Sequence, residues 1–348
     1  MIRGLGTECV GVAGRTLADG RKDDLNLPFK RLRSRNLLHR ALPKPLRRFS
    51  PLRPAALLAS YAKELGADRV LCHYGTVAAE YSEAWDLLDL PLFVYFHGYD
   101  LMFDLRDMDG KGAPAHPSDY KDQIRALSKR AILIANSSFS QGRLLEAGVD
   151  LARIRVNYLG VMPKPEPVLC PAGRPTILYV GRFVDCKGPD QTILAFDLLR
   201  KGGCDAELVM VGGGPLRSAC LKLAAESQFA SDIHLTGVED HQQVERRLAS
   251  ASVFSMHSMK GPISNQEEAF GVAFLDAMSV GLPIVTGNSG GVPEIVKDGV
   301  TGFLFEPGDI EGHASRLKQL IENQSLARQM GMEGWKTACS EFSQRRSD

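Results

Sequence analysis

Two basic side chains follow one short apolar run, at a spacing that suits a diphosphate. The run TILYV at 176–180 is expected to be a strand, and the sequence continues as GRFVDCKG, which places Arg182 and Lys187 just beyond it. Arginine offers a planar fork of donors and lysine a compact charge, so the two can hold a diphosphate from different sides. Isolated Arg and Lys residues are more often solvated surface charges, but the position after a buried strand favours phosphate binding here.

Two acids flank a predicted helix start farther along the chain. Within NQEEAFGVAFLDAM, Glu268 precedes Phe270 and Gly271, and Asp276 follows eight positions after Glu268. A helix that begins near Gly271 would present free N–H groups at Phe270, Gly271 and Val272, where an anionic phosphate can bind. About two helical turns separate the acids, so we expect them to contact different parts of one extended ligand. The shorter acid, Asp276, suits a vicinal diol such as ribose.

Short apolar runs alternate with longer stretches of helical spacing, which is typical of repeated βα units and parallel sheets. A proline-rich stretch at 162–175 forbids both a helix and a central strand, and is the best candidate for a hinge. We therefore predict an α/β protein with two Rossmann-like lobes that face a central cleft, one at 1–165 and one at 166–348. Strands are expected at 8–13, 69–73, 92–96, 131–135, 154–158, 176–180, 206–211, 232–236, 252–256, 282–286 and 302–305.

Two glycine-containing segments argue against a dinucleotide-binding enzyme. In VMVGGGPLR the position of the third required glycine is taken by Arg217, so these glycines predict a close-packed turn under the cleft. A nicotinamide-dependent oxidoreductase would need an intact GxGxxG after its first strand, and GVAGRT at 11–16 does not supply it.

Composition excludes several classes of protein. The chain is 44% hydrophobic and 24% charged with a net charge of +1, which is typical of a soluble globular protein and gives no global attraction to nucleic acid. No apolar run is long enough to cross a bilayer, so we expect a cytoplasmic protein. The segment 21–48 holds ten Lys or Arg residues against two Asp. It could lie on the inner face of a membrane, at about 1 kcal/mol for each basic residue, or remain a solvated face.

Several of these motifs occur in the order found in the retaining glycosyltransferases of family 4, which have the GT-B fold, and the chain resembles that family over roughly residues 90–310. The resemblance implies that Arg182 and Lys187 bind the phosphates, that Glu268 lies near the donor sugar, and that Asp276 binds the ribose hydroxyls. The family normally has a glutamate at this last position. The segment FHGYD at 96–100 resembles the family's HG segment, which implies that His97 lies near the transferred sugar.

Two further segments resemble those that close the first lobe in this family. They are IANSSFSQGRLLE at 134–146 and VNYLGV at 156–161. The start of the chain resembles the family's second strand, so we expect the first βα unit to be missing from the first lobe.

The resemblance implies a retaining glycosyltransferase that moves a hexose-type sugar from a nucleoside-diphosphate sugar to a hydroxyl of a glycan or lipid-linked acceptor. His97 and Glu268 would be the catalytic residues. Neither a metal nor a cofactor is expected, because no DxD-like acid pair and no CxxC pair stands out. Two alternatives stay open: a non-catalytic nucleotide-sugar-binding remnant, and a sugar epimerase of the same fold.

Overall fold

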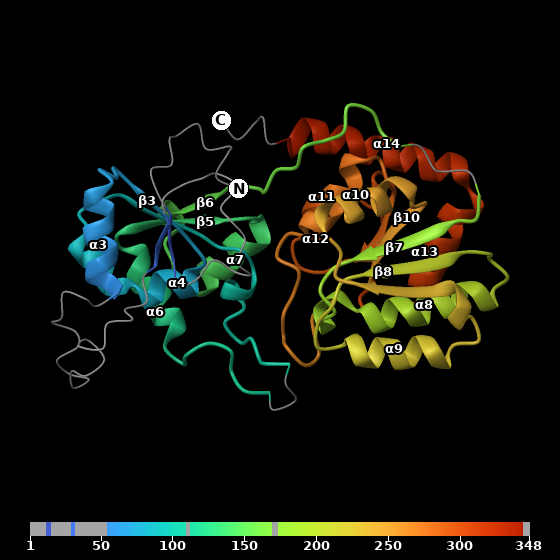
Figure 1. Ribbon diagram of the computed structural model, residues 1–348, viewed down its shortest axis with the longest axis horizontal. Helices are drawn as coiled ribbons and strands as arrows, with labels where there is room; N and C mark the ends of the chain where they lie inside the picture. Colours follow the sequence, from blue (N-terminus) through green and yellow to red (C-terminus); the bar gives the residue numbers. More distant parts are fainter. Residues whose placement is uncertain (1–11, 15–28, 32–53, 109–111, 169–172, 344–348) are drawn as a thin grey trace.

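The chain folds into two α/β lobes that lie side by side (Figure 1). The structure, a computed structural model, describes residues 12–14, 29–31, 54–108, 112–168 and 173–343. Each lobe is built around its own parallel sheet, and a short two-stranded sheet pairs β1 (Val12–Gly14) with β2 (Phe29–Arg31). The predicted α/β architecture with two lobes is confirmed.

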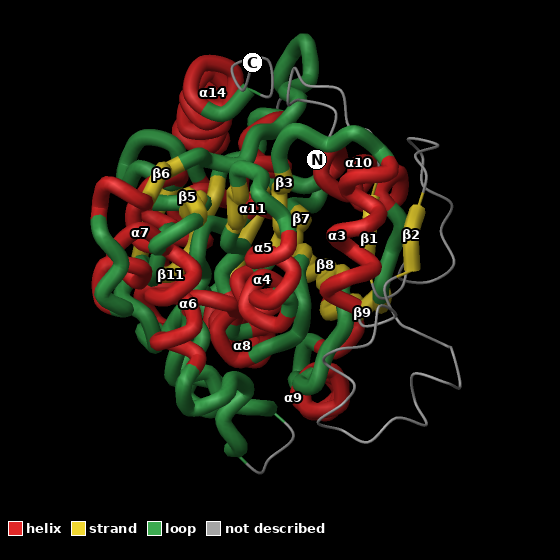
Figure 2. The backbone as a smooth tube through the Cα atoms, turned by 90° about the vertical axis from the view of Figure 1, so that its left-hand side faces the viewer, coloured by secondary structure: helices red, strands yellow, loops and turns green. Residues whose placement is uncertain are grey.

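The first lobe contains a four-stranded parallel sheet in the order β3-β4-β5-β6. Helices separate the strands in the chain, and in Figure 2, where this lobe faces the viewer, α4, α5 and α6 lie in front. The strands are β3 (Val70–His73), β4 (Leu92–Tyr95), β5 (Ala131–Ala135) and β6 (Ile154–Val156). The helices are α3 (Pro54–Glu64), α4 (Gly75–Glu80), α5 (Ser82–Leu87), α6 (Tyr120–Ser128) and α7 (Ser138–Glu146).

The second lobe contains a six-stranded parallel sheet in the order β12-β11-β10-β7-β8-β9. Figure 1 shows α8 and α9 on one side of this sheet and α10, α11 and α14 on the other. The strands are β7 (Thr176–Val180), β8 (Glu207–Val211), β9 (Ile233–Gly237), β10 (Val253–Met256), β11 (Ile284–Gly287) and β12 (Gly302–Phe305). The helices are α8 (Pro189–Lys201), α9 (Arg217–Glu226), α10 (His241–Ser250), α11 (Val272–Ser279), α12 (Val292–Ile295), α13 (Ile310–Glu322) and α14 (Gln324–Glu341).

Burial of the central strands explains their mostly apolar sequences. Every residue of β10 and β11 is buried, as expected for parallel strands that carry helices on both faces. The order of strands in the sheet places β7 and β10 next to each other, although β8 and β9 separate them in the chain. The loops after these two strands therefore emerge at the same edge of the sheet, where ligands of open α/β sheets bind.

The predicted hinge segment is fastened to the second lobe over its described part. Val161 belongs to the apolar core of the second lobe and pairs with Ser343. The backbone N–H groups of Lys164 and Val168 donate to carbonyls at the end of α11, at 3.0 and 2.7 Å. Within 162–168 and 173–175 the backbone forms no helix and no strand, as the prolines predict. The boundary at 165/166 stays a prediction.

The predicted strands agree closely with the structure. Ten of the eleven predicted runs overlap one of the strands β3 to β12, with ends that differ by up to two residues. The run predicted at 8–13 is described only from residue 12 onward, where β1 begins. Most of the basic segment 21–48 lies outside the described residues, and its described part is β2, which the sequence did not predict. In the described parts of the chain, none of the helices has the length and apolar character that a membrane span requires.

Candidate active site

An ion pair joins the two loops that the sequence singled out. Lys187 lies in the β7–α8 loop (residues 181–188) and Glu268 in the β10–α11 loop (residues 257–271). Lys187 Nζ lies 2.6 Å from Glu268 Oε2, and the two side chains are only 19% and 14% exposed. Burial alone would lower the pKa of Lys187, but the Glu268 carboxylate outweighs burial and the pKa is raised. The lysine therefore stays charged at the carboxyl edge of the sheet.

The start of α11 lies beside this ion pair. Gly271 caps the helix with φ 101°, a conformation that favours glycine, and a Cβ there would overlap the Phe274 ring. The same Cβ position lies 3.5 Å from Glu268 Cγ. The first N–H groups of a helix have no intrahelical acceptor, so the amides near Gly271 and Val272 can bind an anion next to Lys187. The Phe270 ring is buried in the core, which leaves only its backbone for such a contact.

Arg182 belongs to the same loop as Lys187 and is exposed. Its positive charge is close enough to lower the pKa of Lys187, although this effect is smaller than those of burial and of Glu268. A hydrogen bond joins this loop to β7, because the Tyr179 hydroxyl donates to the Arg182 carbonyl at 3.0 Å. Both predicted cations therefore occupy one loop beside the start of α11.

The three glycines after β8 form the close-packed turn that the sequence predicts. Gly212 has φ 139°, and a Cβ at this position would overlap the carbonyl oxygen of Gly181. Gly214 has φ 151°, and a Cβ there would meet the backbone of Phe183 at 2.6 Å. The turn thus supports the base of the β7–α8 loop, and only glycine allows this approach.

His97 stands at the carboxyl end of β4 in the first lobe. Its Nε2 lies 2.8 Å from Nδ1 of His73. Burial, together with the neighbouring His73, lowers the pKa of His97 to about 4, so the imidazole is neutral at neutral pH. A neutral imidazole can donate or accept one hydrogen bond with a sugar hydroxyl but carries no charge to the site.

A buried acid that the sequence analysis overlooked shapes the backbone around His97. Asp100 is fully buried, and its carboxylate accepts from the N–H groups of His97 at 3.0 Å, Gly98 at 2.9 Å and Gly75 at 2.8 Å. Gly98 has φ 125°, and a Cβ there would lie 2.8 Å from the Cβ of Ala269. The His97 segment of the first lobe therefore abuts the residue that follows Glu268 in the second lobe.

Asp185 is a second acid to which the sequence gave no role. Its buried carboxylate accepts from the backbone N–H groups of Ile263 at 2.8 Å and Ser264 at 2.7 Å, and from the Ser264 hydroxyl at 2.6 Å. The two loops that carry Lys187 and Glu268 are therefore tied together by this carboxylate as well as by the ion pair. Asp100 lies within FHGYD and Asp185 within GRFVDCKG, so their position within a motif is the sequence signal that could have found them.

In the described part of the chain, no hydrogen bond or ion pair joins the Asp276 side chain to Lys187 or Glu268. Asp276 is half-buried on α11, and burial raises the pKa of its carboxyl. The charged groups near enough to affect that pKa are His241 and Glu245 of α10. The two acids of the segment thus lie in different surroundings, and their contact with different parts of one ligand stays a prediction.

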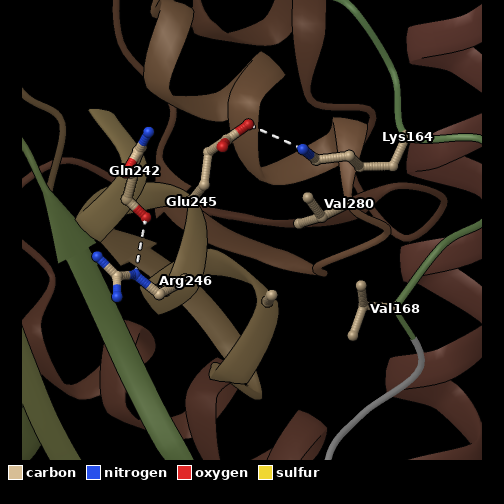
Figure 3. A pocket seen from close by; sticks show the side chains of 7 residues that line it. Lys164, Val168, Gln242, Glu245, Arg246 and Val280 are labelled. Carbon is tan, nitrogen blue, oxygen red and sulfur yellow. Dashed lines mark hydrogen bonds and ion pairs between the residues drawn. The ribbon is translucent and has the colours of Figure 1, made fainter. Parts of the chain in front are cut away.

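A hollow of about 580 Å³ lies between α10, the end of α11 and residues 164–168, and none of the predicted site residues lines it. Figure 3 shows the ion pair that crosses it, between Lys164 Nζ and Glu245 Oε1 at 2.8 Å. The residues that line it come from the predicted hinge segment, α10 and the end of α11. They are Lys164, Val168, Gln242, Glu245, Arg246, Ala249 and Val280. This hollow is separate from the Lys187–Glu268 site.

The sequence is similar to proteins that transfer sugars. Residues 164–337 match the family described as glycosyl transferases group 1. The chain is 29% identical over 303 residues to the GDP-mannose-dependent alpha-(1-6)-phosphatidylinositol monomannoside mannosyltransferase of Mycobacterium tuberculosis, covering 83% of this chain and 70% of that protein. It is 27% identical over 277 residues to the amylovoran biosynthesis glycosyltransferase of Erwinia amylovora, covering 78% of this chain and 65% of the relative.

Solved structures share the fold. Sucrose-phosphate synthase from Thermosynechococcus elongatus superposes with a TM-score of 0.74 at 19% identity, covering 94% of this chain and 82% of that one. TarM of S. aureus superposes with a TM-score of 0.67 at 18% identity, covering 85% of this chain, and this chain spans only 57% of TarM.

The predicted GT-B arrangement of two Rossmann-like lobes is confirmed by these similarities together with the two parallel sheets. The matched residues include the β7–α8 loop, the β10–α11 loop and α11, which carry all the predicted donor-binding residues. The chain belongs to the glycosyl transferases group 1 family.

Proposed function

We propose that the chain transfers a hexose-type sugar from a nucleoside-diphosphate sugar to a hydroxyl acceptor, with retention of the anomeric configuration. The observation that carries this proposal is the contact of Lys187 with Glu268 beside the start of α11, 2.6 Å between Nζ and Oε2. A cation, a carboxylate and free helix N–H groups at one point suit a sugar diphosphate, which presents an anion and a carbon of growing positive charge side by side.

In this mechanism the bond between the anomeric carbon and the bridging oxygen of the diphosphate breaks, and its electron pair stays on the leaving phosphate. Lys187, Arg182 and the amides near Gly271 stabilise the charge that grows there, which is usually the largest catalytic contribution. The acceptor oxygen forms the new bond to the anomeric carbon, and its proton passes to the leaving phosphate. Because these groups supply the positive charge, we propose that transfer needs no metal ion.

The remaining predicted residues contact the rest of the substrate in this proposal. Glu268 lies near the donor sugar and Asp276 binds the ribose. His97 faces the transferred sugar from the first lobe, where the neutral imidazole can share a hydrogen bond with a hydroxyl. The contact of Gly98 with Ala269 supports this placement, because it brings the His97 segment next to the Glu268 segment.

Calorimetric titration with GDP, UDP and ADP, combined with a turnover assay on the matching nucleotide sugars, tests the function. We expect one nucleotide to bind preferentially and its sugar conjugate to be consumed, in the presence of a chelator as well as in its absence. GDP has first priority, because the mycobacterial relative is GDP-mannose-dependent by its name. Binding without turnover would instead support a non-catalytic remnant, and a product formed without any acceptor would support an epimerase.

We further propose that the acceptor is a glycan or a lipid-linked sugar and that the basic segment 21–48 holds the protein against an anionic membrane surface. The name of the mycobacterial relative describes a phosphatidylinositol monomannoside mannosyltransferase, which supports a lipid-linked acceptor. Vesicles with phosphatidylserine should co-sediment the protein, and neutralising the basic residues of 21–48 should reduce that binding by at least about tenfold, at roughly 1 kcal/mol for each residue. Unaltered co-sedimentation would contradict the membrane contact.

A further inference from the structure

A carboxylate of the second lobe binds the tip of a helix in the first lobe. Glu294 lies on α12, and its Oε2 and Oε1 accept from the backbone N–H groups of Ser138 at 2.7 Å and Phe139 at 2.8 Å. Both amides belong to the first turn of α7, where N–H groups have no intrahelical acceptor and the helix dipole favours a negative charge. Each carboxylate oxygen of Glu294 therefore accepts a hydrogen bond from the first lobe.

An aromatic residue extends this contact to the predicted donor site. The Tyr158 hydroxyl donates to Glu294 Oε2 at 2.9 Å, and the Tyr158 ring stacks on the Phe270 ring with 5.6 Å between centroids. Phe270 directly precedes Gly271, whose helix start is the proposed phosphate site. The segment VNYLGV, which the sequence analysis had singled out, thus touches the β10–α11 loop through Tyr158.

The cap of α7 contacts the same loop. Ser137 Oγ accepts from the Ser140 N–H at 2.9 Å and donates to the carbonyl oxygen of Ala269 at 2.6 Å. From the other side, the N–H of Gly291, which precedes α12, donates to the Glu268 carbonyl at 2.8 Å. The stretch Glu268–Phe270 is therefore enclosed between the tip of α7 and the α12 region.

We propose that Glu294 is a positioning residue that aligns the two lobes for sugar transfer. Its carboxylate binds the tip of α7 and so holds the first lobe in contact with the segment that carries Glu268. Glu294 does not contact the proposed phosphate site itself. It acts through Tyr158 and through the tip of α7 at Ser137, which both contact the β10–α11 loop. The inference rests on the proposed function, because alignment matters only where a donor on one lobe must meet an acceptor on the other.

Replacing Glu294 by glutamine is the direct test, because the change keeps the shape and removes the charge. One carboxylate oxygen becomes an NH₂ group that faces a backbone N–H, so one of the two α7 contacts is lost. We expect kcat to fall by about 10- to 100-fold, since misplacement by about 1 Å can cost that much. The affinity for the nucleoside diphosphate should change less than about threefold, because the phosphate contacts come from the second lobe alone.

Hydrogen exchange provides a readout that does not depend on turnover. The amides of Ser138 and Phe139 should exchange faster in Glu294→Gln than in the wild-type protein, because their acceptor is weakened. Glu294→Asp keeps the charge on a shorter stem and should recover part of the lost kcat. Glu341→Gln is the matched control. Glu341, Tyr158 and Glu294 all line one hollow of about 290 Å³, so the control makes the same chemical change close to Glu294. It should leave kcat and the exchange of the α7 amides unchanged.

Two results would overturn the proposal. Unchanged exchange at Ser138 and Phe139 would show that Glu294 does not hold α7, and faster exchange with wild-type kcat would show that the contact has no role in alignment. Failure of the proposed function looks different, because the wild-type protein would then neither bind a nucleoside diphosphate nor turn over. In that case the exchange measurement still decides whether Glu294 holds the two lobes together.

Discussion

Lys187→Ala is expected to lower kcat/KM by about 10³-fold, because a preorganised charge at the leaving group typically contributes 10²- to 10³-fold and ground-state binding is lost as well. The same change leaves the Glu268 carboxylate without its partner in a site where the two side chains are only 19% and 14% exposed. Breaking such a pair by removing one partner costs about 3 kcal/mol of folding free energy. Steady-state kinetics and urea unfolding measure the two effects separately.

Lys222→Ala is the control for the loss of a lysine. Lys222 is 76% exposed on α9 and lies 3.8 Å from Glu226, so its removal should change stability by less than about 0.5 kcal/mol and leave kinetics intact.

Arg182→Ala should weaken diphosphate binding with little loss of stability, because Arg182 is exposed. A Lys187→Ala protein with kcat/KM within twofold of wild type would remove Lys187 from the mechanism.

Glu268→Gln is expected to separate catalysis from binding. The change removes a negative charge from beside the anomeric carbon, and we expect kcat to fall by about 10²-fold. The affinity for the nucleoside diphosphate should not weaken, because Lys187 loses the carboxylate that competes with the phosphates for its charge. Single-turnover kinetics with calorimetry on the same samples would measure both quantities.

The neighbouring acid gives a matched control for this change. Glu267 lies on the same loop and its Oε1 is 3.5 Å from the Ser289 hydroxyl, so Glu267→Gln makes the same chemical change without touching Lys187. It should leave kcat within about twofold of wild type, because Glu267 does not carry the ion pair with Lys187. If Glu268→Gln lost diphosphate affinity to the same extent as Lys187→Ala, the two residues would act only as a structural pair.

The parallel sheets could be predicted because burial on both faces favours nearly continuous apolar runs. TILYV and the runs that became β8, β10 and β11 are mostly apolar, and helical spacing follows each of them. β2 was missed because Phe29–Arg31 is two-thirds basic and carries no strand signal. Local pattern therefore predicted the elements of both large sheets.

The contacts between loops could not be predicted, because they depend on which strands lie next to each other. Lys187 meets Glu268 because β7 and β10 are neighbours, and the order of strands in a sheet is not written in any local pattern. The contact of Glu294 with α7 joins residues about 155 positions apart in the chain. Asp100 and Asp185 were overlooked because a buried acid that accepts backbone N–H groups has the same sequence signal as a solvated one.

The central claim is that Lys187, Arg182 and the amides at the start of α11 bind one diphosphate. A crystal structure of the protein with the nucleoside diphosphate that binds best tests it most directly. We predict that the β-phosphate lies within hydrogen-bonding distance of Lys187 Nζ and of the amide of Gly271 or Val272, about 2.7–3.2 Å. A diphosphate bound elsewhere, with Lys187 still paired only to Glu268, would contradict the claim.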